Sequence, residues 1–447
     1  MSAAAIAALD EINGVPERAP VPILDEAAYH GLVGEYVKLI SPYTEASPAA
    51  VLACALTAIG ALLNRGPRWR LGSDEHHTRL FVLLVGPTGA GRKGQAIGWG
   101  ARKLLEAIDP DFHRAKVVTG LSSAEGLIAE IRDAVPDSVD AKGKTLVGDS
   151  GVIDKRLLVI EEEFAGALQA MSREGNRLSP VLREAWDGRN LGSLVKKDRQ
   201  RVTDPHICIV GSITAAELAL QLKATSVRNG LANRFLPIFT ARARLLPLNP
   251  DVPKRELEVI FAKLRTAVDA ARRIQFVRWS PTAQDRWVEL YPSLAVPANA
   301  TSVVRALVER GAPYVHRLAM LYGVLDGTGE VQLSHLDAAK ALWRFAEGTW
   351  RLVYSDSTPL TPLAARLLRA IEEAADKGCS RTRLRKAAGS NDILAGAITS
   401  ELNALAAEGL VHREQVRTDG RTKEVWRHAR HVGEQIRPQD EEHEQQL

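Results

Sequence analysis

The stretch from Leu80 to Ala101, LFVLLVGPTGAGRKGQAIGWGA, constrains the fold of this chain more than any other part of its 447 residues. The apolar run from Phe81 to Val85 predicts a buried strand, and a glycine-rich turn and a helix-compatible segment follow it. This order of strand, glycine loop and helix is the one that a phosphate-binding loop requires. Glycines let backbone amides curl around an anion, and the N-terminus of the helix adds partial positive charge. The alternative is an ordinary tight turn.

The loop departs from the usual G-x-x-x-x-G-K-[ST] spacing of such sites. Arg92 follows Gly91 directly, Lys93 comes one position later, and Gln95 stands where a magnesium-binding hydroxyl is expected. Lys93 supplies the mobile full charge that phosphates attract. We expect the whole loop to hold the phosphates of ATP, through Gly86, Pro87, Thr88, Gly89, Ala90, Gly91, Arg92, Lys93, Gly94 and Gln95.

A second apolar run, from Leu157 to Ile160, predicts a strand of a parallel sheet that is covered on both faces. Glu161, Glu162 and Glu163 follow at its carboxyl end, where open α/β sheets place their ligands. If the extended backbone continues, Glu161 and Glu163 point to the same side and Glu162 to the other. We then expect Glu161 to hold Mg²⁺ through water and Glu163 to polarise the attacking water. The alternative is a charged first turn of a helix, which acidic residues favour.

Four further residues are candidates for sensing phosphate. Ser212 and Thr214 follow the apolar run at 206–210, and each either senses the γ-phosphate or caps the next helix. Arg234, just before another apolar run, is a candidate arginine finger for its own or a neighbouring subunit. Arg317, in an amphipathic helical segment, is a candidate second sensor. For both arginines the alternative is an ordinary surface or interhelical position.

The net charge of +4 does not by itself require a nucleic-acid partner, so any DNA-binding surface must be local. One dense group of cations follows the segment that contains Trp186. Such a group suits contact with phosphate backbone, which does not depend on base sequence. The candidate DNA contacts in this group are Lys196, Lys197, Arg199 and Arg201. A solvated hairpin would have a similar composition.

The region 356–430 has the pattern of a winged-helix domain. Three helical segments, at 363–376, 380–388 and 392–408, precede a predicted hairpin that turns at Asp419-Gly420. The third helical segment has few arginines that could read guanine, so we expect contacts mainly with the DNA backbone. The expected contacts on the hairpin are Arg413, Arg417, Arg421 and Lys423. The alternative is a winged helix that docks on another protein.

Composition also bounds the domains and the cell compartment. The apolar run from Ala49 to Leu63 is too short to span a membrane, and it predicts a buried helix. Three widely spaced cysteines indicate a reducing compartment, so we expect a cytoplasmic protein with no membrane partner. The expected order is an N-terminal helical segment at 1–45, a P-loop ATPase core at 46–249, a helical lid at 250–355, the winged helix at 356–430 and a disordered tail at 431–447.

Several of these segments together resemble the family of mobile-element and phage P-loop ATPases, which are helicase-like and often fused to primase-polymerase domains. The resemblance runs from about residue 20 to 355, and it rests on the segments SPYTEASPAAVL, VGPTGAGRKG, LVIEEEFAGAL, LREAWDG, NGLANRFL and HRLAMLYGVLDG. It implies that Lys93 is the working lysine and that Glu161 and Glu163 match a pair of glutamates separated by one residue. Gln95 replaces the serine or threonine that is usual in the family.

The resemblance implies an α/β P-loop NTPase core with a mostly parallel sheet, a helical lid and a C-terminal winged helix. The order of elements is also similar to hexameric replicative helicases of the minichromosome-maintenance type, which are AAA+ proteins. We therefore expect an ATP- and Mg²⁺-dependent, ring-forming DNA motor, a helicase or replication factor of a mobile genetic element. Two alternatives stay open: a nucleotide-switched regulator or defence-type ATPase that does not unwind DNA, and a nucleotide-binding scaffold that does not hydrolyse, which Gln95 would suit.

Overall fold

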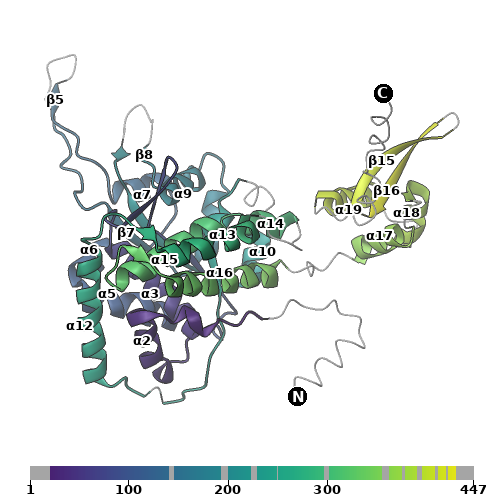
Figure 1. Cartoon of the computed structure of the whole chain (residues 1–447). Coiled ribbons are helices and arrows are strands. Elements are labelled where there is room, and N and C mark those ends of the chain that lie inside the picture. Colours follow the sequence, from purple (N-terminus) through teal and green to yellow (C-terminus); the bar gives the residue numbers. More distant parts are fainter. Residues whose placement is uncertain are drawn as a thin grey trace, which may run out of the picture. The chain divides into compact units, whose positions relative to one another are not determined.

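The computed structural model describes residues 21–139, 145–192, 200–222, 229–248, 250–295, 302–354, 362–374, 378–389, 395–407, 411–418 and 421–428. The chain divides into two compact units (Figure 1). The larger unit takes in the described residues from Val21 to Ala295 and from Val304 to Tyr354, and the smaller consists chiefly of those from Pro362 onward. The first 20 residues of the expected N-terminal helical segment and the expected tail at 431–447 lie outside the described residues.

A five-stranded, wholly parallel sheet forms the centre of the larger unit. Its strands are β3 (Phe81–Val85), β4 (Val117–Val118), β7 (Arg156–Glu161), β10 (His206–Ile213) and β11 (Leu236–Phe239). They lie side by side in the order β11–β3–β10–β7–β4. Every residue of β3 and β10 is buried, as expected where helices cover both faces of a parallel sheet. The α/β core predicted from the apolar runs is confirmed.

The connections between the strands run toward one edge of the sheet after β3 and toward the other edge after β10. After β3 it passes to the far edge at β4 and returns through β7 to β10, and after β10 it crosses β3 to form β11. The neighbours β3 and β10 therefore have connections that leave on opposite sides. The register pairs Ser212 with Leu84 and Ile213 with Val85, so the two strands end at the same level. Open α/β sheets bind ligands in the crevice at such a switch point.

Helix α3 (Pro48–Leu62) covers one face of the sheet and lies against β3, β7, β10 and β11. Every residue from Ala49 to Leu62 is buried, which confirms the predicted core helix. On the same face, α4 (Lys93–Ile97) continues through a π-helical turn (Gly98–Lys103) into α5 (Leu104–Ile108). This segment packs closely on α3, since a Cβ on Gly100 would lie 2.5 Å from the Cβ of Cys54.

Helices α8 (Phe164–Met171), α9 (Leu178–Asp187) and α10 (Ala215–Gln221) belong to the opposite face. The side chain of His206 reaches the carbonyl of Gly60 in α3, whereas Gly211, an odd number of residues further along β10, faces the ring of Phe164. Because side chains alternate along a strand, α3 and α8 must cover opposite faces. None of the helices within the described ranges is long and apolar enough to cross a membrane.

The helices that we expected as a separate lid pack with the sheet in one compact unit. Tyr314 shows this most directly, because its buried hydroxyl lies within hydrogen-bond distance of the carbonyls of Phe81 (3.2 Å) and Arg234 (2.6 Å). The remaining α-helices among the described residues up to Tyr354 are α2 (Gly31–Ile40), α6 (Pro110–Lys116), α7 (Ala124–Ala129), α12 (Lys254–Ala271), α13 (Pro281–Ala295), α14 (Ser302–Val308), α15 (Gly311–Leu325) and α16 (Leu333–Val353).

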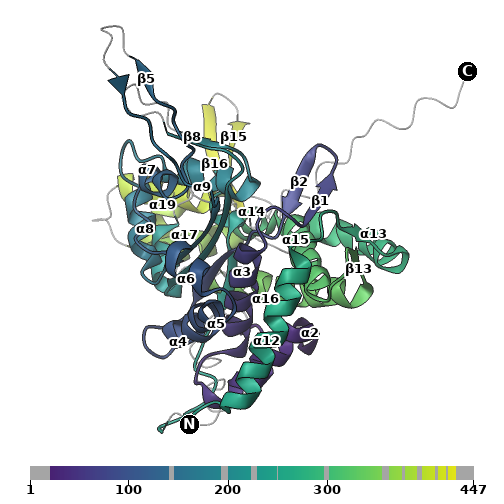
Figure 2. The same ribbon diagram turned by 90° about the vertical axis from the view of Figure 1, so that its left-hand side faces the viewer.

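Short two-stranded sheets decorate the core. They are β1 (Arg68–Leu71) with β2 (Asp74–His77), β5 (Ser138–Val139) with β6 (Thr145–Leu146), β8 (Leu191–Gly192) with β9 (Arg201–Val202), and β12 (Arg278–Trp279) with β13 (Glu330–Val331). Figures 1 and 2 show β5 and β8 at the same end of the larger unit. Asp133, in the segment that leads into β5, contacts the base of the β8–β9 hairpin. Its amide donates to the Arg201 carbonyl (2.7 Å), and its carboxylate accepts from the Thr203 hydroxyl (2.7 Å).

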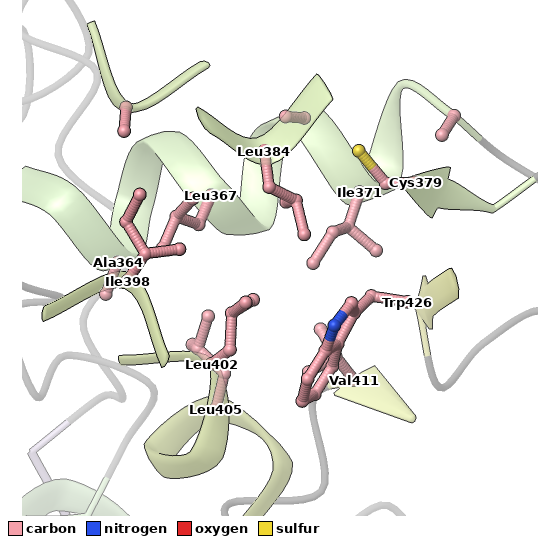
Figure 3. Close-up of a cluster of buried hydrophobic side chains, with 13 residues drawn as sticks. Ala364, Leu367, Ile371, Cys379, Leu384, Ile398, Leu402, Leu405, Val411 and Trp426 are labelled. Carbon is pink, nitrogen blue, oxygen red and sulfur yellow. The ribbon is translucent and has the colours of Figure 1, made fainter. Parts of the chain in front are cut away.

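The smaller unit has its own hydrophobic core. Its elements are α17 (Pro362–Glu372), β14 (Cys379–Ser380), α18 (Arg381–Ala388), α19 (Ala395–Ala407), β15 (Val411–Thr418) and β16 (Arg421–His428). Leu384, Ile371, Leu402 and Trp426 from four of these elements point toward one another (Figure 3). Thr418 pairs with Arg421, which leaves the two-residue connection expected at 419–420, positions that lie outside the described residues. The predicted three helices and hairpin are present.

Candidate functional site

A pocket of about 370 Å³ lies where β3, β7 and β10 end, at the switch point of the sheet. Its walls come from three connections that are far apart in the sequence. The loop after β3 contributes Pro87, Thr88, Gly89, Arg92, Lys93, Gly94 and Gln95. The chain from the end of β7 into α8 contributes Glu162, Glu163 and Ala165, and the chain from the end of β10 into α10 contributes Ser212, Ile213, Thr214 and Glu217. The switch point and the glycine loop thus coincide at one concave site.

The loop after β3 is held by backbone contacts that need glycine. A Cβ on Gly86 would lie 2.1 Å from the carbonyl oxygen of Thr240, just after β11, and Gly89 has a φ of +65°. The hydroxyl of Thr240 donates to the Gly91 carbonyl (2.8 Å), and the Gly91 amide donates to the Pro87 carbonyl (3.0 Å). The loop is therefore fixed between β3 and the chain that follows β11.

Lys93 begins helix α4, and its side chain lies back over the loop. Its Nζ donates to the carbonyls of Gly86 (2.8 Å) and Pro87 (3.2 Å). Burial lowers the pKa of Lys93, while the nearby carboxylates of Glu217 and Glu163 oppose that shift. The first amide of α4 with a helical partner is that of Ala96, so the three amides before it have no helical acceptor. The pocket thus combines a cation with helix-terminal N–H groups, which suits an anion.

Two residues of the loop are anchored to the segment before α3. The guanidinium of Arg92 lies 2.5 Å from the carboxylate of Glu45. The side-chain oxygen of Gln95 accepts from the Thr44 hydroxyl and from the Glu45 amide, both at 3.2 Å. Because this oxygen already has two donors, ligation of Mg²⁺ by Gln95 would require both bonds to break.

The predicted alternation of the three glutamates is wrong. β7 ends at Glu161, whose carboxylate accepts from the backbone amides of Gly120 (3.1 Å) and Leu121 (2.8 Å). A turn then brings Glu162 and Glu163 together into the wall of the pocket, whose described lining does not include Glu161. The cause is that the extended backbone stops at Glu161, so the period of two no longer applies.

The two carboxylates on the pocket side differ in their partners. Glu162 lies 2.6 Å from the guanidinium of Arg102. Glu163 forms no ion pair within the described part of the chain, and it is close enough to Lys93 to affect its pKa. Glu163 can therefore contact a bound ligand without breaking an ion pair, whereas Glu162 would have to leave Arg102.

Ser212 and Thr214 both line the pocket, but their hydroxyls already have partners. Ser212 donates to the Glu162 carbonyl (2.7 Å) and so joins the ends of β10 and β7. Thr214 and Glu217 form a capping box at the start of α10, which is the alternative that we left open for Thr214. These hydrogen bonds hold the pKa of Glu217 below its usual value, and the charge of Lys93 adds to the effect. Glu217 was missed, although the T-x-x-E spacing of a capping box could have revealed it.

Arg234 lies in a buried ion pair, contrary to the expected arginine finger. Its Nη2 is 3.0 Å from the carboxylate of Asp187, its Nη1 donates to the Gly230 carbonyl (2.6 Å), and the residue is only 7% exposed. A finger for a neighbouring subunit needs an exposed guanidinium that is free to reach a phosphate. Pairing within its own chain leaves Arg234 without that freedom.

Arg317 is also a core residue and is not among the residues that line the pocket. Its guanidinium donates to the carbonyls of Arg79 (3.2 Å) and Trp186 (3.0 Å) and stacks 3.6 Å from the centre of the Trp186 ring. Burial lowers the pKa of Arg317 to about 10. The expected sensor role is therefore corrected to a structural one: Arg317 binds the carbonyl of Trp186 at the C-terminal end of α9, where cations are favoured, and the carbonyl of Arg79 just before β3.

The candidate DNA contacts are described only in part. Lys196, Lys197 and Arg199 lie outside the described residues, whereas Arg201 is exposed on β9. Arg413 is exposed on β15 and lies 3.0 Å from the Glu424 carboxylate. The strands β15 and β16 carry the other three, Arg417, Arg421 and Lys423, whose side chains lie outside the described part of the chain.

Among the described residues, one group of three side chains has the composition of a metal site: His30, Asp326 and His335. The amide of Gln332 donates to Nδ1 of His335 (3.0 Å), so the ring proton lies on Nε2, which donates to Asp326 (3.0 Å). A metal bound at Nε2 would require the opposite tautomer, with the proton on Nδ1. The group is therefore a hydrogen-bonded cluster that joins α2, α15 and α16.

No protein-family model matches the chain, and no curated protein sequence matches it either. The function must therefore be inferred from the geometry of the pocket.

Proposed function

We propose that this chain is a P-loop NTPase that binds ATP with Mg²⁺ in the pocket between β3 and β10 and hydrolyses it. The observation that carries the proposal is the position of Lys93. It begins a helix after a glycine loop and faces Glu163 across the switch point of a parallel sheet. Charge, helix amides and a carboxylate at one concave site are the parts that phosphoryl transfer requires.

In the proposed reaction, Lys93 and the first amides of α4 hold the β- and γ-phosphates. Glu163 accepts a hydrogen bond from the attacking water and orients it toward the γ-phosphorus. Carboxylates suit Mg²⁺ as direct or water-mediated ligands, and Glu162, Glu163 and Glu217 are the carboxylates among the described lining residues of the pocket. An ion held by them would neutralise charge on the phosphates. Ser212 fixes the carbonyl of Glu162 and so maintains the distance between β7 and β10.

The test is ATP turnover by the purified protein, with and without single-stranded DNA. We expect Lys93→Ala to lose ATP binding, and Glu163→Gln to bind ATP but turn it over at least 10²-fold more slowly, since it removes general-base assistance. Glu161→Gln is the matched control: it keeps an oxygen for the amides of Gly120 and Leu121, and we expect near-normal turnover. Loss of turnover in the control together with normal turnover in Glu163→Gln would refute the assignment.

We further propose that the chain acts as a cytoplasmic hexameric ring on the DNA of a mobile genetic element, as a helicase or replication factor. The smaller unit supports a winged-helix role, since three helices and a hairpin form one core. Stimulation of turnover by DNA and ATP-dependent displacement of a strand from a fork are the expected results.

A second candidate, a nucleotide-switched regulator, is favoured by one observation. Gln95 offers no hydroxyl, and its oxygen is bound to Thr44 and Glu45. Weak ligation of Mg²⁺ would slow hydrolysis and prolong the ATP-bound state. Tight ATP binding without strand displacement would support this candidate over the motor.

A further inference from the structure

The phosphate-binding loop contains a backbone conformation that its residue disfavours. Among the described residues, three other than glycine have a positive φ: Asn64, Asp204 and Arg92, the last with a φ of 47°. Asparagine and aspartate tolerate this left-handed region because their short side chains hydrogen-bond locally. Arginine has no such compensation, so something outside Arg92 must hold it there.

The conformation of Arg92 sets the direction of α4. Arg92 is the cap of this helix, and its carbonyl accepts the first helical hydrogen bond, from the amide of Ala96 (3.1 Å). Lys93 is the next residue. The direction of the Lys93 side chain and of the first amides of α4 therefore depends on the φ and ψ of Arg92.

The side chain of Arg92 is held by Glu45. The two groups are 2.5 Å apart, and the side chain of Glu45 is only 8% exposed. The other carboxylate oxygen of Glu45 accepts from the amide of Leu246 (2.9 Å), and Arg242 lies 3.7 Å away. The hydrogen bond from Leu246 and the two arginines hold the pKa of Glu45 below its usual value, so the carboxylate is charged at neutral pH.

Glu45 is itself fixed by its backbone. Its amide donates to the side-chain oxygen of Gln95 (3.2 Å), and its carbonyl accepts from the amide of Ala243 (3.0 Å). The residue therefore bridges the loop after β3 and the segment after β11. A carboxylate held at so many points can maintain an unfavourable conformation in the residue that it binds.

We propose that Glu45 is a positioning residue for the phosphate-binding loop: it holds Arg92 in the left-handed conformation and so aims Lys93 and the first amides of α4 at the phosphates. The inference rests on the proposed function, because its main effect is on nucleotide affinity. Glu45 is not among the residues that line the pocket.

The test is a double-mutant cycle in which the affinity for Mg²⁺-ATP is measured by titration calorimetry. We expect Glu45→Gln to weaken binding about tenfold, because glutamine can accept from Leu246 but forms no ion pair with Arg92. Arg92→Gly supplies the second background of the cycle, since glycine adopts the left-handed conformation without the ion pair to Glu45. In the Arg92→Gly background, Glu45→Gln should then have no further effect. An equal tenfold loss in both backgrounds, or none in either, would overturn the inference.

A second readout does not depend on nucleotide. In the protein without ATP, hydrogen exchange of the Arg92 and Ala96 amides should be faster in Glu45→Gln than in wild type. Arg92 donates one of these hydrogen bonds, to the Gly89 carbonyl, and accepts the other, so both depend on its conformation. Unchanged exchange would count against the role of Glu45 even if the wild-type protein failed to bind ATP. Failure of wild type to bind ATP, with faster exchange in Glu45→Gln, would refute the proposed function alone.

Discussion

At the scale of single residues, the ion pair between Arg234 and Asp187 can be tested directly by mutation. We expect Arg234→Ala to lower the free energy of unfolding by about 2–4 kcal/mol, because it leaves a partly buried carboxylate without its main partner. Arg310→Ala is the matched control. Arg310 lies farther from Asp187, at 3.8 Å, and is more exposed, so the loss should be smaller.

Urea denaturation of the two variants measures this difference. If Arg234 were instead a finger, Arg234→Ala would leave stability unchanged and abolish turnover. Mixing the variant with wild-type subunits would then restore part of that turnover.

Sequence reasoning identified Lys93, Glu163 and Ser212 as pocket residues, because a strand that ends in a glycine or polar turn places its next residues at the sheet edge. It misassigned Glu161, since the alternation of side chains holds only while the backbone stays extended, and nothing local marks the end of β7. It also misassigned Arg317, because sequence reports a charge but not the carbonyls that satisfy it in the core.

At the scale of elements, the Asp326 side chain links the helices α2, α15 and α16 through hydrogen bonds. Its carboxylate accepts from His30 (2.7 Å) at the start of α2 and from His335 (3.0 Å) in α16. Partial burial opposes ionisation of Asp326, but these two hydrogen bonds outweigh it and hold its pKa well below the usual aspartate range. The ionised form is therefore more stable in the folded chain than in the unfolded one.

We expect Asp326→Asn to cost about 1–3 kcal/mol at pH 7, the usual range for hydrogen bonds to a charged group. A pKa lowered by folding stabilises the protein above the unfolded value, about 4 for aspartate, and this stabilisation is lost as pH falls below it. The difference between wild type and Asp326→Asn should thus stay constant from pH 8 to about 5 as far as Asp326 is concerned, and shrink toward pH 3. Urea titrations at these pH values measure it; a difference that grows at low pH would contradict the account.

The elements themselves were largely predictable. Continuous apolar runs identified β3, β7 and β10 and the core helix α3, because only buried segments tolerate such runs. The π-helical turn at Gly98–Lys103 was not predicted; it lies where Gly100 approaches α3 closely, and such a long-range contact leaves no local signal. The packing of α15 against the sheet was missed for the same reason: it is made by long-range contacts such as those of Tyr314.

At the scale of the whole molecule, the core of the smaller unit is formed by residues between Ala364 and Trp426. We expect a chain that ends at Tyr354 to unfold in one cooperative transition and to bind ATP like the full chain, because a unit with its own core can fold alone. Calorimetry of both chains would check this. Aggregation of the shortened chain, or an ATP affinity reduced by tenfold or more, would mean that the larger unit depends on the smaller.

Strand β10 connects two different parts of the larger unit, the pocket at its carboxyl end and the hairpins near its amino end. Ser212 near its carboxyl end is tied to the pocket wall, while its amino end at His206 follows directly on the base of the β8–β9 hairpin, which Asp133 contacts through Thr203. Eight residues of parallel strand span about 26 Å. β10 is buried and is hydrogen-bonded to β3 on one side and to β7 on the other, so it is a rigid link between these two ends. One strand therefore sets the position of the pocket wall and of the chain that enters from the hairpin base, so a substitution that shifts β10 would disturb both ends of the sheet together.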